Sequence, residues 1–94
     1  MAIVEQEFAS GPGVSLLFVF DDIAKTITGI RAVNTRGRPI KLIAVLNNID
    51  RSITINTGMN QVISFPPLSY VDGVVRGIST RQIASLNTMG FSDL

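Results

Sequence analysis

The stretch TITGIRAVNTRGRPIKLIAVLNNIDRSITINTGMNQVISFPP, residues 26–67, decides the fold class of this chain. In it, apolar and β-branched runs of strand length alternate with three clusters of turn-forming residues. These clusters are residues 35–39, 47–48 and 56–60. Several short strands at regular spacing, with turn signals between them, are typical of an antiparallel all-β domain. The pattern therefore predicts an all-β fold with a strand over each apolar run.

The same pattern predicts where the strands of this stretch begin and end. Strands are expected over residues 26–35, 40–46, 49–56 and 61–65. Gly29 lies inside the first of them, and a glycine within a strand marks a bulge or a close approach of two backbones. Asn47-Asn48 predicts a two-residue hairpin turn, because asparagine tolerates the left-handed conformation that such turns require. Pro66-Pro67 is expected to end the fourth strand, since proline has no N–H for a strand ladder.

Two segments precede this stretch. Residues 2–8 are expected to form a polar edge strand or an N-terminal arm, followed by a break at residues 9–13. Residues 14–20 are apolar on both faces. That composition fits a strand covered on both sides or a strand half-exposed at an interface.

The C-terminal part contains the strongest hairpin signal and one ambiguous segment. Asp72-Gly73 between two short apolar runs predicts a tight hairpin turn. Residues 79–87 begin with the form of a helix capping box and precede Gly90, which would stop a helix. The alternative is a last strand over residues 82–89, which we prefer because the rest of the chain consists of strands.

Together these elements predict one domain over residues 1–94, with residues 1–13 as an N-terminal arm or edge strand. The expected architecture is a single small antiparallel β-sandwich or barrel-like domain of about seven or eight short strands.

The charge content indicates contact with other subunits. Charged residues are 16% of the chain, against roughly 25% in an average soluble domain. A small domain has much surface to cover, so some strand faces or edges are expected to be covered by another subunit. The alternative is polar cover by Ser, Thr and Asn.

Charge is also distributed unevenly along the chain. Residues 1–24 carry a net charge of −4 and residues 25–94 a net charge of +5. The acidic side chains of the first part are Glu5, Glu7, Asp21 and Asp22. They are candidate interaction residues, because opposite charges attract either within one molecule or head to tail between molecules.

Several classes of function are disfavoured by the composition. The chain has no histidine and no cysteine, so the usual general base near neutral pH and the usual soft nucleophile are both missing. Asp21 and Asp22 would point to opposite faces of a strand, and no acidic spacing matches a calcium loop. We therefore expect a non-enzymatic protein without a cofactor or metal ion.

Two arginines and a tyrosine are the remaining candidates for binding. Arg36 and Arg38 flank Gly37 at an expected hairpin tip, where they could grip a carboxylate, phosphate or sulfate. Tyr70 is the only aromatic residue besides five phenylalanines, which makes a glycan site conceivable but poor in stacking rings. Nucleic acid is a weak candidate, since the basic residues are scattered with little aromatic interleaving.

The expected function is a non-enzymatic structural protein that forms a homo-oligomer or joins other structural proteins. A phage virion component, such as a capsid decoration or tail protein, would share its size, low charge and lack of cysteine. The sequence shows neither a signal peptide nor a membrane span, so folding inside the cell is expected, with assembly into a virion. The alternative is a carbohydrate- or acidic-ligand-binding β-sandwich module that uses Arg36, Arg38 and Tyr70.

Overall fold

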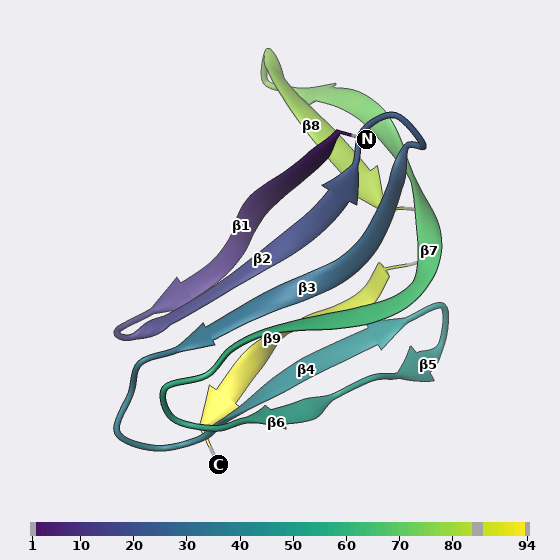
Figure 1. Ribbon diagram of the computed structural model, residues 1–94. Helices are drawn as coiled ribbons and strands as arrows, with labels where there is room; N and C mark the ends of the chain where they lie inside the picture. Colours follow the sequence, from purple (N-terminus) through teal and green to yellow (C-terminus); the bar gives the residue numbers. More distant parts are fainter. Residues whose placement is uncertain (1, 84–85, 94) are drawn as a thin grey trace.

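The computed structural model describes residues 2–83 and 86–93. Nine strands and no helix lie in these ranges (Figure 1). They are β1 (Ile3–Gly11), β2 (Val14–Asp21), β3 (Thr26–Asn34), β4 (Ile40–Leu46), β5 (Ile49–Asp50), β6 (Ile53–Ile55), β7 (Asn60–Val75), β8 (Ile78–Ile83) and β9 (Leu86–Asp93). The all-β prediction is confirmed. The expected number of seven or eight strands was too low, in part because residues 49–56 form two strands, β5 and β6, instead of one.

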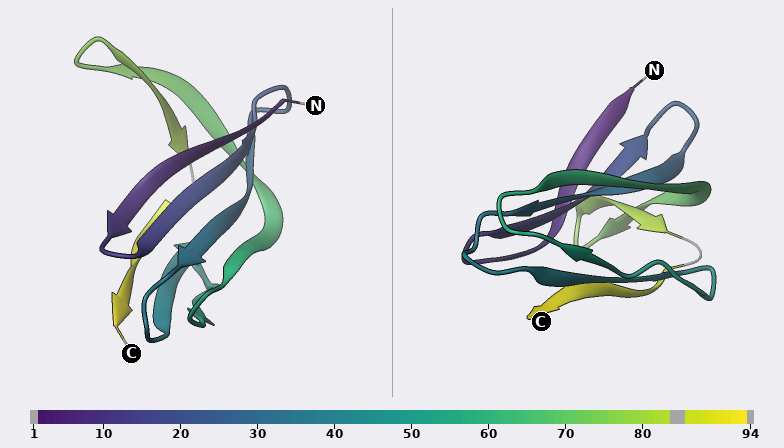
Figure 2. Two further views of the ribbon diagram at one scale, coloured as in Figure 1. Left: turned by 60° about the vertical axis from the view of Figure 1, so that its left-hand side comes forward. Right: turned by 60° about the horizontal axis from the view of Figure 1, so that its bottom comes forward.

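The strands pair antiparallel into two sheets. The first has the order β1-β2-β3-β7-β8. In the second, β4 pairs with β5 and β6 along one edge and with β9 along the other. In Figures 1 and 2 the second sheet lies below β3 and β7.

Both sheets contribute to one hydrophobic core. In β4, alternate residues from Ile40 to Leu46 are buried, as expected for a strand with one face toward the core. The buried apolar residues are Val14, Leu16, Phe20, Ile27, Ile30 and Ala32 in the first sheet, Ile40, Leu42, Ala44, Leu46 and Ile55 in the second, and Tyr70. The core therefore draws on both sheets, mainly through aliphatic side chains at period-two spacing.

A buried asparagine stabilises the segment that connects β3 of the first sheet to β4 of the second. Asn34, at the end of β3, is fully buried. Its Nδ2 donates to the carbonyl oxygens of Arg38 and Ile55, each at 3.0 Å, and its Oδ1 accepts from the backbone N–H of Arg36 at 2.9 Å. Because the amide oxygen and nitrogen both have partners, its burial carries no penalty for an unpaired polar group.

Gly29 shows the close backbone approach that its position predicts. A Cβ atom added there would lie 2.7 Å from the carbonyl oxygen of Ile63 in β7. The pairing of β3 shifts its register beside this residue, with both β2 and β7. The prediction of a bulge or a close approach is confirmed.

The two prolines do not end a strand, as had been expected. β7 runs through Pro66-Pro67, and its pairing with β3 joins Ser64 to Gly29 and Leu68 to Ile27. Residues 65–67 therefore lie opposite Thr28 alone, in a bulge where no N–H is needed for the ladder.

The expected turn at Asp72-Gly73 is also wrong, because the hairpin turns at Arg76-Gly77, with φ angles of 51° and 78°. Asp72 and Gly73 instead lie in β7, paired with Arg81 and Thr80. The longer hairpin lets Asp72 form an ion pair with Lys25 at 2.9 Å. Asp-Gly is the pair with the stronger local turn preference, so the position of this turn is not set by local preference alone.

The ambiguous segment, residues 79–87, is a strand wherever it is described. It contributes to β8 and β9, and residues 84–85 between them lie outside the described residues. The helix alternative is therefore wrong for the described part, and the strand expected over residues 82–89 is shared between two strands.

Candidate functional site

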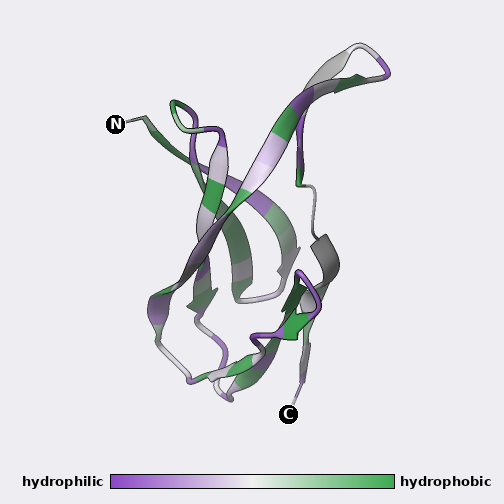
Figure 3. Cartoon of the chain, turned by 90° about the vertical axis from the view of Figure 1, so that its right-hand side faces the viewer, coloured by the Kyte–Doolittle hydropathy of each residue, from purple (hydrophilic) through white to green (hydrophobic). Residues whose placement is uncertain are grey.

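The most distinctive surface feature is the hairpin formed by residues 70–83. We call this hairpin the arm; it is not the N-terminal segment of residues 1–13. It consists of the last part of β7 and all of β8, paired from Tyr70 with Ile83 to Val75 with Ile78. Figure 3 shows this hairpin standing clear of the rest of the chain. The turn of the hairpin is therefore the tip of a projection from the rest of the domain.

The arm carries two apolar side chains that are largely exposed. Val71 is 61% exposed and Val74 is 70% exposed. Residues three apart on a strand point to opposite faces, so each face of the arm presents a valine to solvent. Neither face therefore rests on the body at these positions.

Three side chains at the base of the arm, Asp22, Tyr70 and Arg81, form what we call the anchor cluster. Arg81 holds Asp22 with two parallel hydrogen bonds, from Nε to Oδ1 at 3.0 Å and from Nη2 to Oδ2 at 2.8 Å. The hydroxyl of Tyr70 donates to the same carboxylate. This bidentate geometry fixes the direction of the arm as well as its position.

Neighbouring groups extend the anchor cluster into the first sheet. Arg81 Nη1 donates to Oε1 of Gln6 in β1 at 2.9 Å. The guanidinium carbon lies 5.1 Å from the centre of the Phe20 ring and 5.9 Å from that of the Tyr70 ring, within the range of cation–π attraction. The arm is thus tied to β1, to β2 and to the β2–β3 turn.

The contacts within the cluster shift the pKa values of its three members. Hydrogen bonds from Arg81 and Tyr70 lower the pKa of Asp22 from its ordinary 3.8 to about 2. Burial and the bond to Asp22 raise the pKa of Tyr70, and the bond to Asp22 raises the pKa of Arg81. At neutral pH the cluster therefore holds a fixed carboxylate, phenol and guanidinium, and none of the three is poised to transfer a proton.

Residues 36–38, which we call the arginine loop, were expected to grip an acidic ligand, but they already hold a carboxylate of the chain itself. Arg36 Nη1 lies 2.7 Å from Oδ1 of Asp93, and Arg38 Nη2 lies 3.1 Å from its Oδ2. Arg36 Nε also donates to the carbonyl oxygen of Pro12 at 2.7 Å. An open depression of about 460 Å³ lies over this loop, with Gly37 in its lining.

The four acidic residues singled out in the sequence are not brought together. Glu5 pairs with Arg31 at 2.7 Å and Asp22 with Arg81, so part of the opposite charge is matched within the molecule. Asp21 accepts the backbone N–H groups of Ile23 and Ala24 and thereby closes the turn after β2. Glu7 is exposed and has no ion pair with any residue that the structure describes.

Tyr70 lies inside the molecule. Its side chain is 4% exposed and meets the Phe20 ring edge-on, with 5.2 Å between ring centres. A sugar therefore has no open face of this ring on which to stack. Arg81, which completes the cluster, was not expected as a site residue, because it lies 59 positions from Asp22 in the sequence and no local motif links the two.

The described residues contain neither a membrane-spanning helix nor a cluster of metal ligands. No helix there has the length and apolar character needed to cross a membrane. In residues 2–83 and 86–93, acidic side chains do not gather in threes as they would around a metal ion.

Comparison of the chain with protein-family models, with curated proteins and with solved structures finds no match.

Proposed function

We propose that this chain is a non-enzymatic structural protein that assembles with copies of itself through the arm. The exposure of Val71 and Val74 on opposite faces of a projecting hairpin carries this proposal. A two-stranded hairpin alone is at best marginally stable in water. Burying one valine side chain contributes about 1.5–3 kcal/mol, so a neighbouring subunit would supply the cover that the body does not.

The anchor cluster supports the same proposal. Binding is weakened when a flexible segment must be ordered at the interface. The bidentate contact between Arg81 and Asp22 holds the arm in one direction before any partner arrives. An arm ordered in advance is suited to repeated, identical contacts between subunits.

Open strand edges offer a second means of contact. β1 and β8 lie at the two ends of the first sheet. Each has a row of backbone groups to which a strand of a neighbour could be added. We take the two sheets and their shared core to form a small sandwich-like module, with the arm extending one sheet beyond it.

Small virion components, such as phage capsid decoration or tail proteins, combine these traits. The proposal of this class rests on analogy of size, composition and fold. The alternative of a module for glycans or acidic ligands has less support. Asp93 already occupies the arginine loop, and Tyr70 is buried.

The solution mass tests this proposal, measured by light scattering behind size exclusion at low and high salt. We expect a defined oligomer that persists at high salt, because apolar contacts are not screened while exposed ion pairs are. The double variant Val71→Thr, Val74→Thr keeps the β-branched shape. The dissociation constant of its oligomer should be at least about tenfold higher than that of the parent chain.

Met59→Gln is the matched control, because it replaces a 41% exposed apolar side chain outside the arm and should leave the mass unchanged. A parent chain that is monomeric at every concentration would overturn the proposal. An oligomer that the double variant leaves intact would show that the arm is not the contact.

A further inference from the structure

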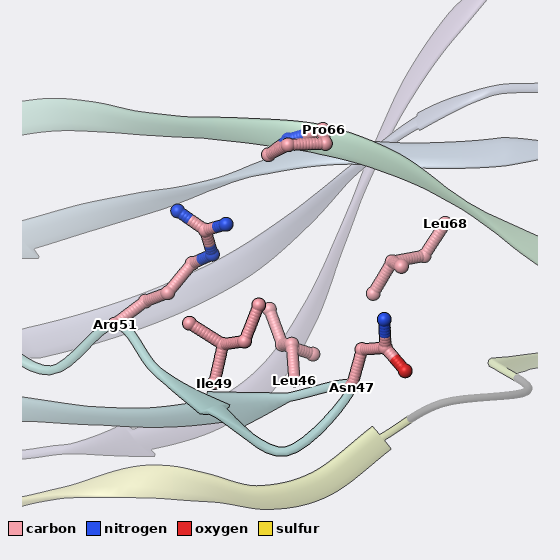
Figure 4. A pocket seen from close by; sticks show the side chains of 6 residues that line it. All are labelled: Leu46, Asn47, Ile49, Arg51, Pro66 and Leu68. Atoms are coloured by element: carbon pink, nitrogen blue, oxygen red, sulfur yellow. The ribbon is translucent and has the colours of Figure 1, made fainter.

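A small cavity lies where the β4–β5 hairpin faces the bend of β7. Its volume is about 190 Å³. Six residues line it: Leu46, Asn47, Ile49, Arg51, Pro66 and Leu68 (Figure 4). The lining comes from both sheets, so a molecule in the cavity would touch the second sheet below and β7 above.

The cavity has apolar walls and one cationic group. Leu46 is 2% exposed and forms part of the core, while Ile49 is 50% exposed at the edge. In Figure 4 the side chains of Arg51 and Asn47 both rise toward β7, on either side of the two aliphatic residues. Ligand pockets are typically lined by apolar side chains with a few polar groups that fix the orientation of the ligand, and this lining has that form.

The guanidinium of Arg51 is available for a ligand. Its backbone N–H donates to the carbonyl oxygen of Ala44 at 2.7 Å, which fixes the residue beside β4. Within residues 2–83 and 86–93, its side chain has no hydrogen-bond or ion-pair partner. This contrasts with Arg36 and Arg81, whose guanidinium groups are held by carboxylates of the chain.

We infer that this cavity binds a short aliphatic carboxylate, with its carboxylate on Arg51 and its chain between Leu46, Ile49 and Leu68. The planar guanidinium matches a carboxylate through two parallel hydrogen bonds. A water-sized group occupies about 30 Å³, so the cavity holds roughly six such groups, which corresponds to an acid of about four to six carbons. The inference is independent of the proposed assembly.

A titration of the ¹⁵N-labelled chain with acetate, butyrate, hexanoate and hexanol, followed by amide chemical shifts, tests this inference. We expect shifts for hexanoate centred on residues 46–51 and on Leu68. The affinity should rise about fourfold for each added CH₂ until the cavity is full, and reach a Kd on the order of millimolar. Hexanol lacks the charge and should bind about tenfold or more weakly.

Two variants separate the charged and the apolar part of the site. Arg51→Gln should weaken hexanoate binding about tenfold or more and leave hexanol binding unchanged. Ile49→Ala should reduce the gain in affinity from acetate to hexanoate, because it removes one aliphatic wall. Lys41→Gln is the matched control, since it removes the same charge from an exposed position of β4 outside the cavity.

Equal binding of hexanol and hexanoate, or an Arg51→Gln variant that keeps its native spectrum and full affinity, would overturn the carboxylate contact. Acetate binding as tightly as hexanoate would overturn the aliphatic part, because it would indicate a simple anion site. Shifts that map to the arginine loop instead of residues 46–51 would place the binding elsewhere.

Discussion

The β1–β2 hairpin and the arm are two hairpins of one sheet that are held in different ways. Each is joined by a two-residue turn, Pro12-Gly13 in the first and Arg76-Gly77 in the second. The β1–β2 hairpin packs its inner side into the core through Val14, Leu16 and Phe20. The arm has exposed valines on both faces and is fastened at its base by charged and polar groups.

The difference separates what stabilises the body from what positions the arm. Burial of apolar side chains contributes most of the stability of a small domain, and the β1–β2 hairpin shares in it. It also stacks Phe8 on Phe18 with 4.0 Å between ring centres. The anchor cluster instead gives the arm its direction through hydrogen bonds, and it leaves Val71 and Val74 exposed.

The same substitution in both hairpins should give the largest contrast. Val14→Ala removes two methyl groups from a side chain that is 3% exposed and should lower the free energy of unfolding by about 2–3 kcal/mol. Val74→Ala acts on a 70% exposed side chain and should change it by less than about 0.5 kcal/mol. Chemical denaturation, at concentrations low enough to avoid association, measures both. Similar losses would show that the arm is packed in solution.

Two glycines give a smaller contrast of the same kind. Gly29→Ala would push a Cβ against the backbone oxygen of Ile63, 2.7 Å away, and should cost about 1–2 kcal/mol. Gly73→Ala in the arm would meet only the side chain of Gln82 at 3.2 Å, which is exposed and can turn aside. This variant should be neutral or stabilise by roughly 0.5 kcal/mol. A large loss for Gly73→Ala would mean that the arm is as closely packed as the body.

Acid should release the arm before it affects the β1–β2 hairpin. The pKa of Asp22 is lowered in the folded chain to about 2 from 3.8. The anchor therefore contributes its full stability above about pH 4 and loses it as the pH falls through about 2. Tyr70 is the only tyrosine and there is no tryptophan, so its ultraviolet absorption reports on the base of the arm alone.

Asp22→Asn is the control for this titration, since its amide cannot ionise and the transition near pH 2 should disappear. A transition near pH 4 in the parent chain would contradict the contact between Asp22 and Arg81. The buried side chains of Val14 and Leu16 are aliphatic and do not titrate. Their amides should keep their protection from hydrogen exchange while those of the arm lose it.

Sequence reasoning succeeds where local signals determine the structure. β4 spans Ile40–Leu46 as predicted, because an apolar run is bounded by Pro39 on one side and by turn residues on the other. The turn at Asn47-Asn48 has φ angles of 51° and 61°, the left-handed conformation that the two asparagines predicted. In each of these cases, the residues that decide the outcome are adjacent in the sequence.

It fails where the register depends on distant residues. Asp72-Gly73 has the stronger local turn preference, yet the hairpin turns at Arg76-Gly77, where Asp72 meets Lys25 and Arg81 meets Asp22. The prolines of β7 lie within a strand because residues 65–67 bulge opposite Thr28. The anchor cluster joins three parts of the chain that no sequence pattern links. Asp22 and Tyr70 were predicted separately, as an acidic interaction residue and a candidate for glycan binding, and Arg81 was not predicted at all.

The turn of the arm offers the smallest test. Arg76 has a φ of 51°, a conformation that costs most side chains free energy and that asparagine tolerates better. Arg76→Asn should therefore stabilise the arm by about 0.3–0.5 kcal/mol, measured by amide hydrogen exchange of residues 71–74 at constant pH. The reverse change at the equivalent position of the β4–β5 hairpin, Asn47→Arg, should destabilise that hairpin by a similar amount. If Arg76→Asn instead loosens the arm, the arginine side chain contributes a contact at the turn. The arm would then be held at its tip as well as at its base, and the contrast with the β1–β2 hairpin would be weaker.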